Sequence, residues 1–314
     1  MALILNEEQL MLREAASDFL NGRAPVSHLR ELRDSRNKDG FSTELWSEMV
    51  DMGWAAILIP EVYGGLDYGY TGLGLVLEQC GKTLSPSPLM STALLGSSAL
   101  LLSGNESLCE QWLPKVAAGE ALLALACEET RQHRPSRVDT RAEADGDSFR
   151  LNGQKLAVMD GSTANAFIVS ARTGSGDKPG QGISLFLVPA QSEGLNLQTT
   201  ENLDNRRVCT LQFNDVTVDS SQLLGPFDNA YPLIEKILDR GRIGMAAEML
   251  GIAQESFERT VQYLKERKQF GVAIGSFQAL QHRAAKLFGE IELCKSVVLK
   301  ALQAIDADSD EVPV

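Results

Sequence analysis

The chain has 314 residues, of which 44% are hydrophobic and 23% are charged, so it can form two or three domains around a sizeable core. Its formal net charge of −13 argues against nucleic acid and anionic membrane surfaces as partners, but a locally basic site can still bind an anionic ligand. Residues 1–5 are followed at once by polar and acidic residues, so no signal peptide is expected, and no apolar run is long enough to insert across a membrane.

The cysteines and histidines show no disulfide framework and no metal-binding pattern. Five cysteines are scattered without CxxC spacing, and the three histidines lie far apart in the sequence. The pattern predicts free thiols in a reducing compartment. We therefore expect a cytoplasmic protein without metal ligands.

Helical periodicity dominates the N-terminal part of the chain. Apolar residues recur at helical spacing in residues 10–20, 42–53, 72–80 and 89–102, and clusters of Gly and Pro interrupt the pattern. We predict an N-terminal helical domain over residues 1–121.

The hydrophobic pattern of the sequence changes after this helical part. Short alternating segments separated by Gly- and Asp-rich turns predict antiparallel strands over residues 122–225, packed as a barrel or sandwich. Helical periodicity resumes after Pro226, which predicts a C-terminal helical domain over residues 226–314. The expected fold class is α+β.

Residues 267–282 join two long predicted helices. The first covers residues 232–266, with the cations Arg267 and Lys268 in its last turn and Gly271 ending it. The second helix is expected to begin near Phe277.

A group of ligand-like side chains gathers at this corner. Arg267, Phe270 and Gln278 supply a guanidinium, an aromatic ring and an amide, which suit a nucleotide pyrophosphate and its sugar. A helix hairpin closed by ordinary capping residues is the alternative interpretation.

The corner resembles the R-x-x-F-G…F-Q string of the acyl-CoA dehydrogenase family. Further strings in matching order are P-E-V-Y-G-G (60–65), E-Q-C-G (78–81), W-L-P (112–114), L-N-G-Q-K (151–155) and F-N-D-V (213–216). The resemblance covers the whole chain. It implies a helical, β and helical domain order, FAD as cofactor, and α,β-dehydrogenation of an acyl-CoA thioester. It also implies that Arg267, Gln269, Phe270 and Gln278 contact an FAD held mainly by the neighbouring subunit.

The part of the family pattern that cradles a chain's own flavin is altered here. The family has A-x-T-E-P-x-x-G-S-D after the first strand, whereas residues 126–133 place Glu128 at the Thr position and lack G-S-D. The family's K-x-W-I-T follows the L-N-G motif, whereas this chain has Ala157 at the aromatic position and Met159 at the hydroxyl position. We expect weakened flavin binding in this β domain. Divergence compensated elsewhere is the alternative.

The family's catalytic carboxylate is also missing from its usual places. Gly241 stands at the helix base position of the D-x-E-R string, so no catalytic residue is identified in this chain. The other family position lies in a Y-E-G-T loop, and the chain stops at Val314 before any such loop. Residues 306–312 resemble an acidic inter-helix loop, so we expect either a truncated chain with an incomplete bundle or a shortened subunit.

Asp239 and Arg242 match residues that line the family's substrate channel. The resemblance assigns them to substrate binding. A simple Asp–Arg helix pair at i,i+3 spacing is the alternative.

The retained and altered motifs together favour a heteromeric enzyme. We predict a subunit of an FAD-dependent acyl-CoA dehydrogenase that completes a partner's FAD site and that is inactive by itself because it lacks the base. The L-D-N-R-R string of residues 203–207 loosely resembles a branch with unlike subunits that acts on steroid-type side chains. The alternatives are a self-sufficient homo-oligomeric enzyme lacking its last helices and a non-catalytic scaffolding subunit.

The expected partners follow from the same resemblance. They are an acyl-CoA substrate from fatty acid or steroid degradation, an electron-acceptor flavoprotein, and further subunits in a dimer or tetramer with FAD at the interface.

Overall fold

The computed structural model describes residues 3–176, 178–309 and 312, and they form two compact units. The first consists of Met1–His28, Gly69–Ser85 and Arg242–Val314, and the second of Leu29–Tyr68 and Pro86–Gly241. The three-domain division made from the sequence stays a prediction.

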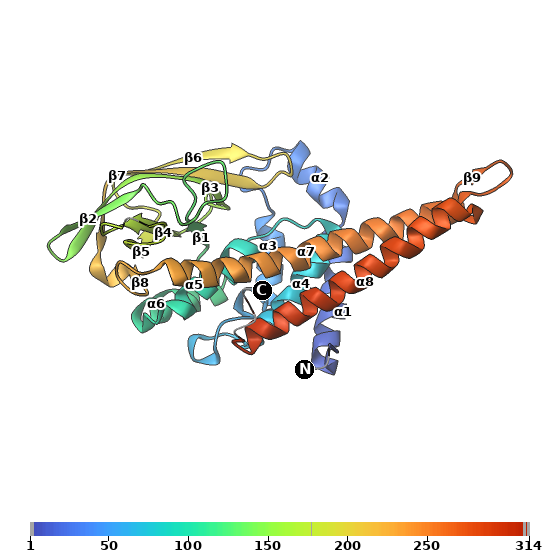
Figure 1. Cartoon of the computed structure of the whole chain (residues 1–314), viewed down its shortest axis with the longest axis horizontal. Coiled ribbons are helices and arrows are strands. Elements are labelled where there is room, and N and C mark those ends of the chain that lie inside the picture. The colour runs from blue at the N-terminus through green and yellow to red at the C-terminus, as the bar shows by residue number, and fades with distance from the viewer. Residues whose placement is uncertain (1–2, 177, 310–311, 313–314) are drawn as a thin grey trace. The chain divides into compact units, whose positions relative to one another are not determined.

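A mixed β-sheet forms the centre of the second unit (Figure 1). Its strands follow the order β6-β7-β3-β2-β4-β5-β8, and β1 pairs with β4. The strands are β1 (Leu123–Ala126), β2 (Arg141–Asp145), β3 (Ser148–Met159), β4 (Ala166–Arg172), β5 (Ile183–Pro189), β6 (Leu195–Glu201), β7 (Arg207–Asp219) and β8 (Leu223–Leu224).

The expectation of purely antiparallel strands is wrong at one place in the sheet. β1 runs parallel to β4 over Leu123–Ala126, and β2 meets β4 in a single parallel pair, Arg141 with Arg172. The β2–β3 hairpin lies between β1 and β4 in sequence and returns the chain to the same direction, which a parallel pair requires.

Two apolar clusters cover the central strands because their side chains alternate between the faces. Ile168 and Leu185 belong to a cluster with helical residues such as Leu113. Phe167 and Phe186 belong to the cluster on the other side, with Leu211. The nearly continuous burial of β4 and β5 follows from this double cover.

Helices make up most of the remaining chain, as predicted. The α-helices are α1 (Glu7–Arg23), α2 (Val26–Asp34), α3 (Thr43–Asp51), α4 (Gly69–Thr83), α5 (Ser97–Ser103), α6 (Glu106–Ala117), α7 (Tyr231–Glu266) and α8 (Gln278–Asp306). The 3-10 helices are η1 (Trp54–Ala56), η2 (Glu61–Tyr63), η4 (Ser220–Gln222) and η5 (Ile274–Ser276), and η3 (Leu89–Gly96) is a π-helix. The η3 segment is a fully buried π-helix, a form that is rare and often found at functional sites.

In the first unit, the C-terminal half of α7 and the antiparallel α8 form a long arm with a hairpin at its end (Figure 1). The predicted range of this helix, 232–266, agrees with α7, but the placement of Arg267 and Lys268 in its last turn was wrong, because both lie beyond Glu266. Strands β9 (Lys268–Gln269) and β10 (Val272–Ala273) follow and pair antiparallel. Phe270 and Gly271 turn the hairpin with φ of 53° and 81°, so Gly271 serves the turn and not the helix end.

Two glycines allow α4 and α7 to cross at backbone contact. A Cβ on Gly251 would lie 1.8 Å from the carbonyl oxygen of Glu78, and a Cβ on Gly81 would lie 2.0 Å from that of Glu248. Only residues without a side chain fit at such distances.

The end of α8 is tied to the start of α4 by one carboxylate. Asp306 accepts hydrogen bonds from the backbone N–H groups of Tyr70 (2.6 Å) and Thr71 (3.0 Å) and from the Thr71 hydroxyl (2.5 Å). It therefore acts as the N-cap of α4 from 235 residues away in the chain. Asp306 was predicted to lie in an inter-helix loop, but α8 includes it.

The helix crossing can be tested with alanine. We expect Gly251→Ala to lower the free energy of unfolding by about 1–3 kcal/mol, because the added methyl group must push two backbones apart. Gly289→Ala is the matched control on α8, where nothing lies within 4 Å of the added atom. It should stabilise the chain by about 0.5–1 kcal/mol because Ala is the better helix former. Urea unfolding of both variants measures the difference, and equal stabilities would contradict the proposed crossing.

Candidate functional site

A buried ion pair organises the segment after β1. The Lys155 ammonium on β3 lies 2.6 Å from a Glu129 carboxylate oxygen and donates to the Ser170 hydroxyl at 2.9 Å. The exposed fractions of the two charged side chains are 0% for Lys155 and 7% for Glu129. Glu129 also accepts from the backbone N–H groups of Asp139 (2.5 Å) and Thr140 (3.1 Å). The pair therefore joins β3, β4 and the loop before β2.

The electrostatics of this pair follow from burial and close contact. Burial disfavours the charged form of Glu129, but the Lys155 charge and the hydrogen bonds from Lys155, Thr140 and Asp139 outweigh it and lower the pKa of the carboxyl. Burial also lowers the pKa of Lys155, against the attraction of Glu129. Glu129 is thus a structural residue, and it is not available as a base.

The side chain of Glu128 folds back onto its own loop. Its carboxylate contacts His133 Nδ1 at 2.6 Å and accepts from the Arg134 backbone N–H at 3.0 Å. Its carbonyl oxygen accepts from the N–H of Leu156 on β3 at 2.7 Å. The loop that should present a hydroxyl to a flavin is therefore closed on itself by a carboxylate.

Strand β3 keeps a bulge at the position where the family places its aromatic residue. The pairing of β3 with β7 shifts between Lys155 and Val158, and Ala157 lies exposed there with φ of 52°. No ring is available at this position to stack on a flavin. The Met159 sulfur lies 3.7 Å from an Arg206 nitrogen, where the resemblance calls for a hydroxyl.

A buried carboxylate follows the bulge. Asp160 is 9% exposed, has φ of 53°, and accepts a 2.6 Å hydrogen bond from the Ser91 hydroxyl on η3. This bond connects the end of β3 to the π-helix. Sequence reasoning missed both residues, and the signal available was only the position of Asp160 directly after the altered flavin motif.

The corner predicted to meet a nucleotide forms the end of the α7–α8 arm. The carbonyl oxygen of Arg267 accepts from the N–H of Ile274 at 2.8 Å, which closes the hairpin. Phe270 is 92% exposed, and its ring lies edge-on to Phe277 at a centroid distance of 6.2 Å. Gln278 is the first residue of α8, which has no side-chain N-cap among the described residues.

The four predicted contact residues are thus gathered in one exposed segment. Arg267, Gln269, Phe270 and Gln278 all have exposed side chains. An uncapped helix start next to an Arg is a suitable place for a phosphate group. The geometry of the corner is compatible with the assignment, and the assignment stays a prediction.

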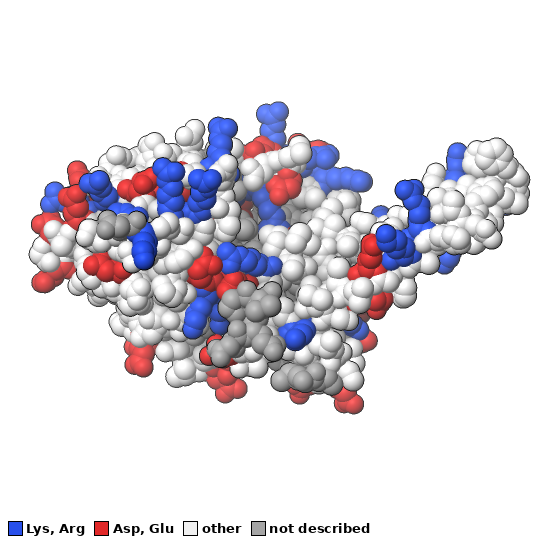
Figure 2. Space-filling view, in the orientation of Figure 1, with Lys and Arg blue, Asp and Glu red and all other residues white. Residues whose placement is uncertain are grey.

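The local charge of the corner differs from that of the chain. Between residues 259 and 286 the sequence carries six cations, Arg259, Lys265, Arg267, Lys268, Arg283 and Lys286, and one carboxylate, Glu266. The outer end of the arm is white and blue in Figure 2, which agrees with this count. A net charge of −13 therefore does not prevent the arm from attracting an anion.

The position of the missing base is occupied by a neighbouring side chain. A Cβ on Gly241 would lie 2.8 Å from Leu95 Cδ2, and Leu95 is 8% exposed on η3. A carboxylate at residue 241 would require Leu95 to move. Asp239 and Arg242 lie on the same helix, half-buried and exposed respectively, and their substrate role is untested.

The described residues contain no group of three His, Cys, Asp or Glu side chains arranged to hold a metal ion. The five cysteines are free thiols, four of them buried. Burial raises the pKa of Cys127 to about 12, so it is not a nucleophile. No helix within the described ranges has the length and hydropathy needed to cross a bilayer.

Family models match nearly the whole chain in three consecutive parts. The acyl-CoA dehydrogenase N-terminal domain matches residues 6–120, the middle domain residues 125–216 and the C-terminal domain residues 231–313. The chain belongs to the acyl-CoA dehydrogenase family. This confirms the predicted family, its fold, FAD as the cofactor of the family, and an oxidoreductase acting on CH–CH groups.

Individual acyl-CoA dehydrogenases support the assignment. The probable acyl-CoA dehydrogenase YngJ of Bacillus subtilis is 32% identical, with 95% of this chain and 79% of that protein covered. Butyryl-CoA dehydrogenase from Megasphaera elsdenii has a TM-score of 0.88 at 26% identity, over 99% of this chain and 83% of that one. The ChsE4-ChsE5 complex from Mycobacterium tuberculosis has a TM-score of 0.86 at 25% identity, with 98% and 80% covered.

The buried ion pair of this acyl-CoA dehydrogenase gives a pH-dependent prediction. We expect Glu129→Gln to lower the free energy of unfolding at pH 7 by about 3–5 kcal/mol, because it leaves the Lys155 charge buried without a partner. The folded-state pKa of Glu129 lies below its ordinary 4.5, so its contribution is complete above pH 4.5 and is lost as the pH falls through the lower value.

The difference between the wild-type protein and Glu129→Gln should therefore shrink as the pH falls below 4.5. Urea unfolding at several pH values measures it. Glu143→Gln, on an exposed position of β2, is the control and should change stability by less than about 0.5 kcal/mol. A constant difference at all pH values would contradict the assignment of the ionised carboxylate.

Proposed function

We propose that this chain is the partner-completing subunit of a heteromeric FAD-dependent acyl-CoA dehydrogenase. In this proposal, Arg267 and its neighbours at the end of the arm hold the nucleotide part of an FAD whose ring is cradled by an unlike subunit. The main support is the contrast between the two regions that face a flavin in this family, the arm and the β domain. The arm keeps an exposed guanidinium, ring and amide, whereas the β domain offers Ala157 and a self-closed Glu128 loop.

Each region supports a different part of this proposal. At the arm, Arg267 would pair with the pyrophosphate, Phe270 would cover the nucleotide, and Gln278 would hydrogen-bond from the uncapped start of α8. FAD supplies the hydride acceptor in this family. This chain's own contribution is to position the cofactor and exclude water, and the α-proton would be removed by a carboxylate of the unlike subunit, since Gly241 provides none.

The surface of the arm supports an oligomer. Large apolar side chains on and beside it are exposed, namely Tyr263, Phe270, Leu287, Phe288, Leu293 and Val297. Exposed apolar patches of this kind mark interaction surfaces. A solved relative, the ChsE4-ChsE5 complex, joins two named chains, which supports an unlike partner here.

The substrate and cellular setting are part of the same proposal. A second solved relative is described as a steroid ACAD and is 30% identical with a TM-score of 0.85, which supports a bulky acyl-CoA ester as substrate. The free thiols support a reducing compartment such as the cytoplasm, where an electron-acceptor flavoprotein would reoxidise the flavin.

The absorbance of the purified chain tests the proposal directly. The chain alone should lack the flavin bands, because its β domain lacks the stacking ring and the hydroxyl groups of the family's flavin contacts. Co-purified with an unlike acyl-CoA dehydrogenase subunit, it should form a yellow complex that oxidises acyl-CoA. A yellow, active preparation of this chain alone would contradict the proposal and favour a self-sufficient homo-oligomer.

Arg267→Ala in the reconstituted complex tests the role of the arm. We expect the Kd for FAD to rise by about ten- to a hundredfold, because a charge-assisted hydrogen bond to phosphate is lost. Lys286→Ala removes another exposed cation of the arm and serves as the control, with an expected change of less than about threefold. An unchanged FAD affinity in Arg267→Ala, with the complex intact, would favour the scaffolding alternative.

A further inference from the structure

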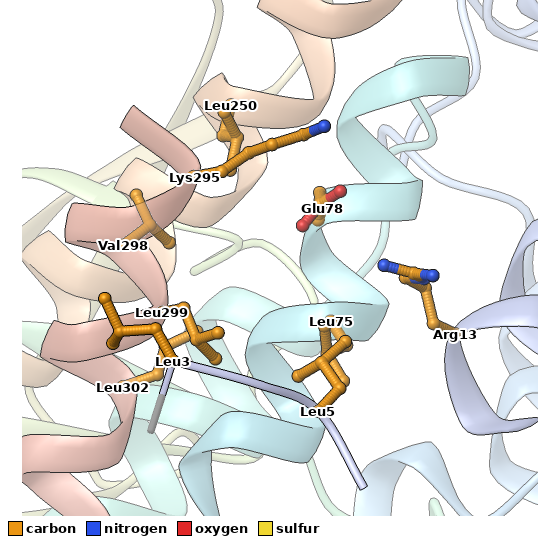
Figure 3. Close-up of a pocket in the computed structure, with 10 residues that line it drawn as sticks. All are labelled: Leu3, Leu5, Arg13, Leu75, Glu78, Leu250, Lys295, Val298, Leu299 and Leu302. Atoms are coloured by element: carbon orange, nitrogen blue, oxygen red, sulfur yellow. The ribbon is translucent and has the colours of Figure 1, made fainter. Parts of the chain in front are cut away.

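A pocket lies in the first unit, at the junction of α1, α4, α7 and α8 (Figure 3). Its volume is about 220 Å³. None of its lining residues belongs to the flavin-facing corner or to the predicted substrate pair. Its walls are Leu3, Leu5, Arg13, Leu75, Glu78, Leu250, Lys295, Val298, Leu299 and Leu302.

The pocket has an apolar part and a charged part. On α8, residues 295, 298, 299 and 302 follow i, i+3, i+4, i+7 spacing, so one stripe of the helix supplies Lys295 and then three apolar side chains. Leu75 and Leu250 extend the apolar wall from α4 and α7. The charged groups gather around Glu78, toward which the Arg13 guanidinium is directed from α1 (Figure 3).

The charges favour an anionic head group. Two cations, Arg13 and Lys295, line the pocket against one carboxyl group, Glu78. The Lys295 ammonium also forms an ion pair with Glu292, at 2.7 Å from its carboxylate oxygen. Within the part of the chain that the structure describes, no carboxylate lies within the 4.0 Å ion-pair distance of the Arg13 guanidinium. Arg13 therefore has its donors available for a ligand.

Glu78 supplies the carboxyl group that lines the pocket. Burial raises the pKa of its carboxyl, against the opposing influences of Lys82, Gln254, Arg13 and Lys295. A raised pKa weakens the repulsion between this carboxyl group and an anionic ligand. The volume sets the length of the tail: an engineered cavity of roughly 150 Å³ binds benzene, so this pocket suits a chain of about six to nine carbons.

We propose that this pocket binds a free aliphatic carboxylate of medium length, with its tail among the leucines and its head group beside Arg13 and Glu78. A CoA thioester is far too large for the pocket, so the site is distinct from that of the acyl-CoA substrate. Occupation would connect α1, α4 and α8 through one ligand.

Calorimetric titration of the purified chain with sodium octanoate and with 1-octanol tests the site. Octanoate should bind one equivalent per chain, at least about tenfold more tightly than octanol, because only the anion engages Arg13. Saturating octanoyl-CoA should leave the octanoate Kd unchanged. The absence of octanoate binding, equal affinities for the two ligands, or competition with octanoyl-CoA would each overturn the proposal.

Two variants separate the head group from the tail. Arg13→Ala should weaken octanoate binding by about tenfold and leave octanol binding unchanged, which also shows that the pocket is still folded. Glu78→Gln removes the charge that repels the ligand and supplies an amide donor, so octanoate should bind at least as tightly at pH 8 as to the wild-type protein. Arg23→Ala, at the exposed end of the same helix, is the control. If Arg13→Ala weakens both ligands equally, or neither, the assignment of the head group is overturned.

Discussion

The buried contact between Lys155 and Glu129 is the constraint on which the β unit and its candidate site depend. A fully buried ammonium is tolerated only with a close carboxylate and further hydrogen bonds: Lys155 also donates to Ser170, and the Thr140 backbone N–H donates to Glu129. Because the pair holds the loop after β1 against β3, it also determines where Glu128 and Ala157 lie. The self-closed loop and the bulge at Ala157 are therefore both connected to this buried pair.

The first unit depends on a different constraint, which is close helix contact. Gly81 and Gly251 let the backbones of α4 and α7 touch, and Asp306 fastens the end of α8 to the start of α4. The arm extends from this junction with large apolar side chains exposed, and in the proposed assembly this surface contacts the unlike subunit. The pocket beside Glu78 lies on the same helices, lined by residues of α1, α4, α7 and α8.

The two units differ in which flavin-contact residues of the family they retain. The β unit preserves the fold of an acyl-CoA dehydrogenase but not the stacking ring or the hydroxyl of its flavin contacts. The arm preserves an exposed Arg, Phe and Gln with local positive charge. The family's base is absent at Gly241, and the Leu95 side chain occupies the space beside this glycine. Such a chain can complete a site in a partner more readily than it can operate one of its own.

The sequence alone determined the family, the α+β fold and the positions of most helices, because periodicity and ordered short motifs depend on local chemistry. It also identified Arg267, Phe270 and Gln278 as one group, since a helix corner brings near neighbours together. Only the tertiary structure showed that Arg267 lies beyond the helix end, in a hairpin closed at Ile274. The partners of Lys155, Asp160 and Asp306 were likewise decided by tertiary contacts, because a side chain's long-range neighbour leaves no periodic trace in the chain.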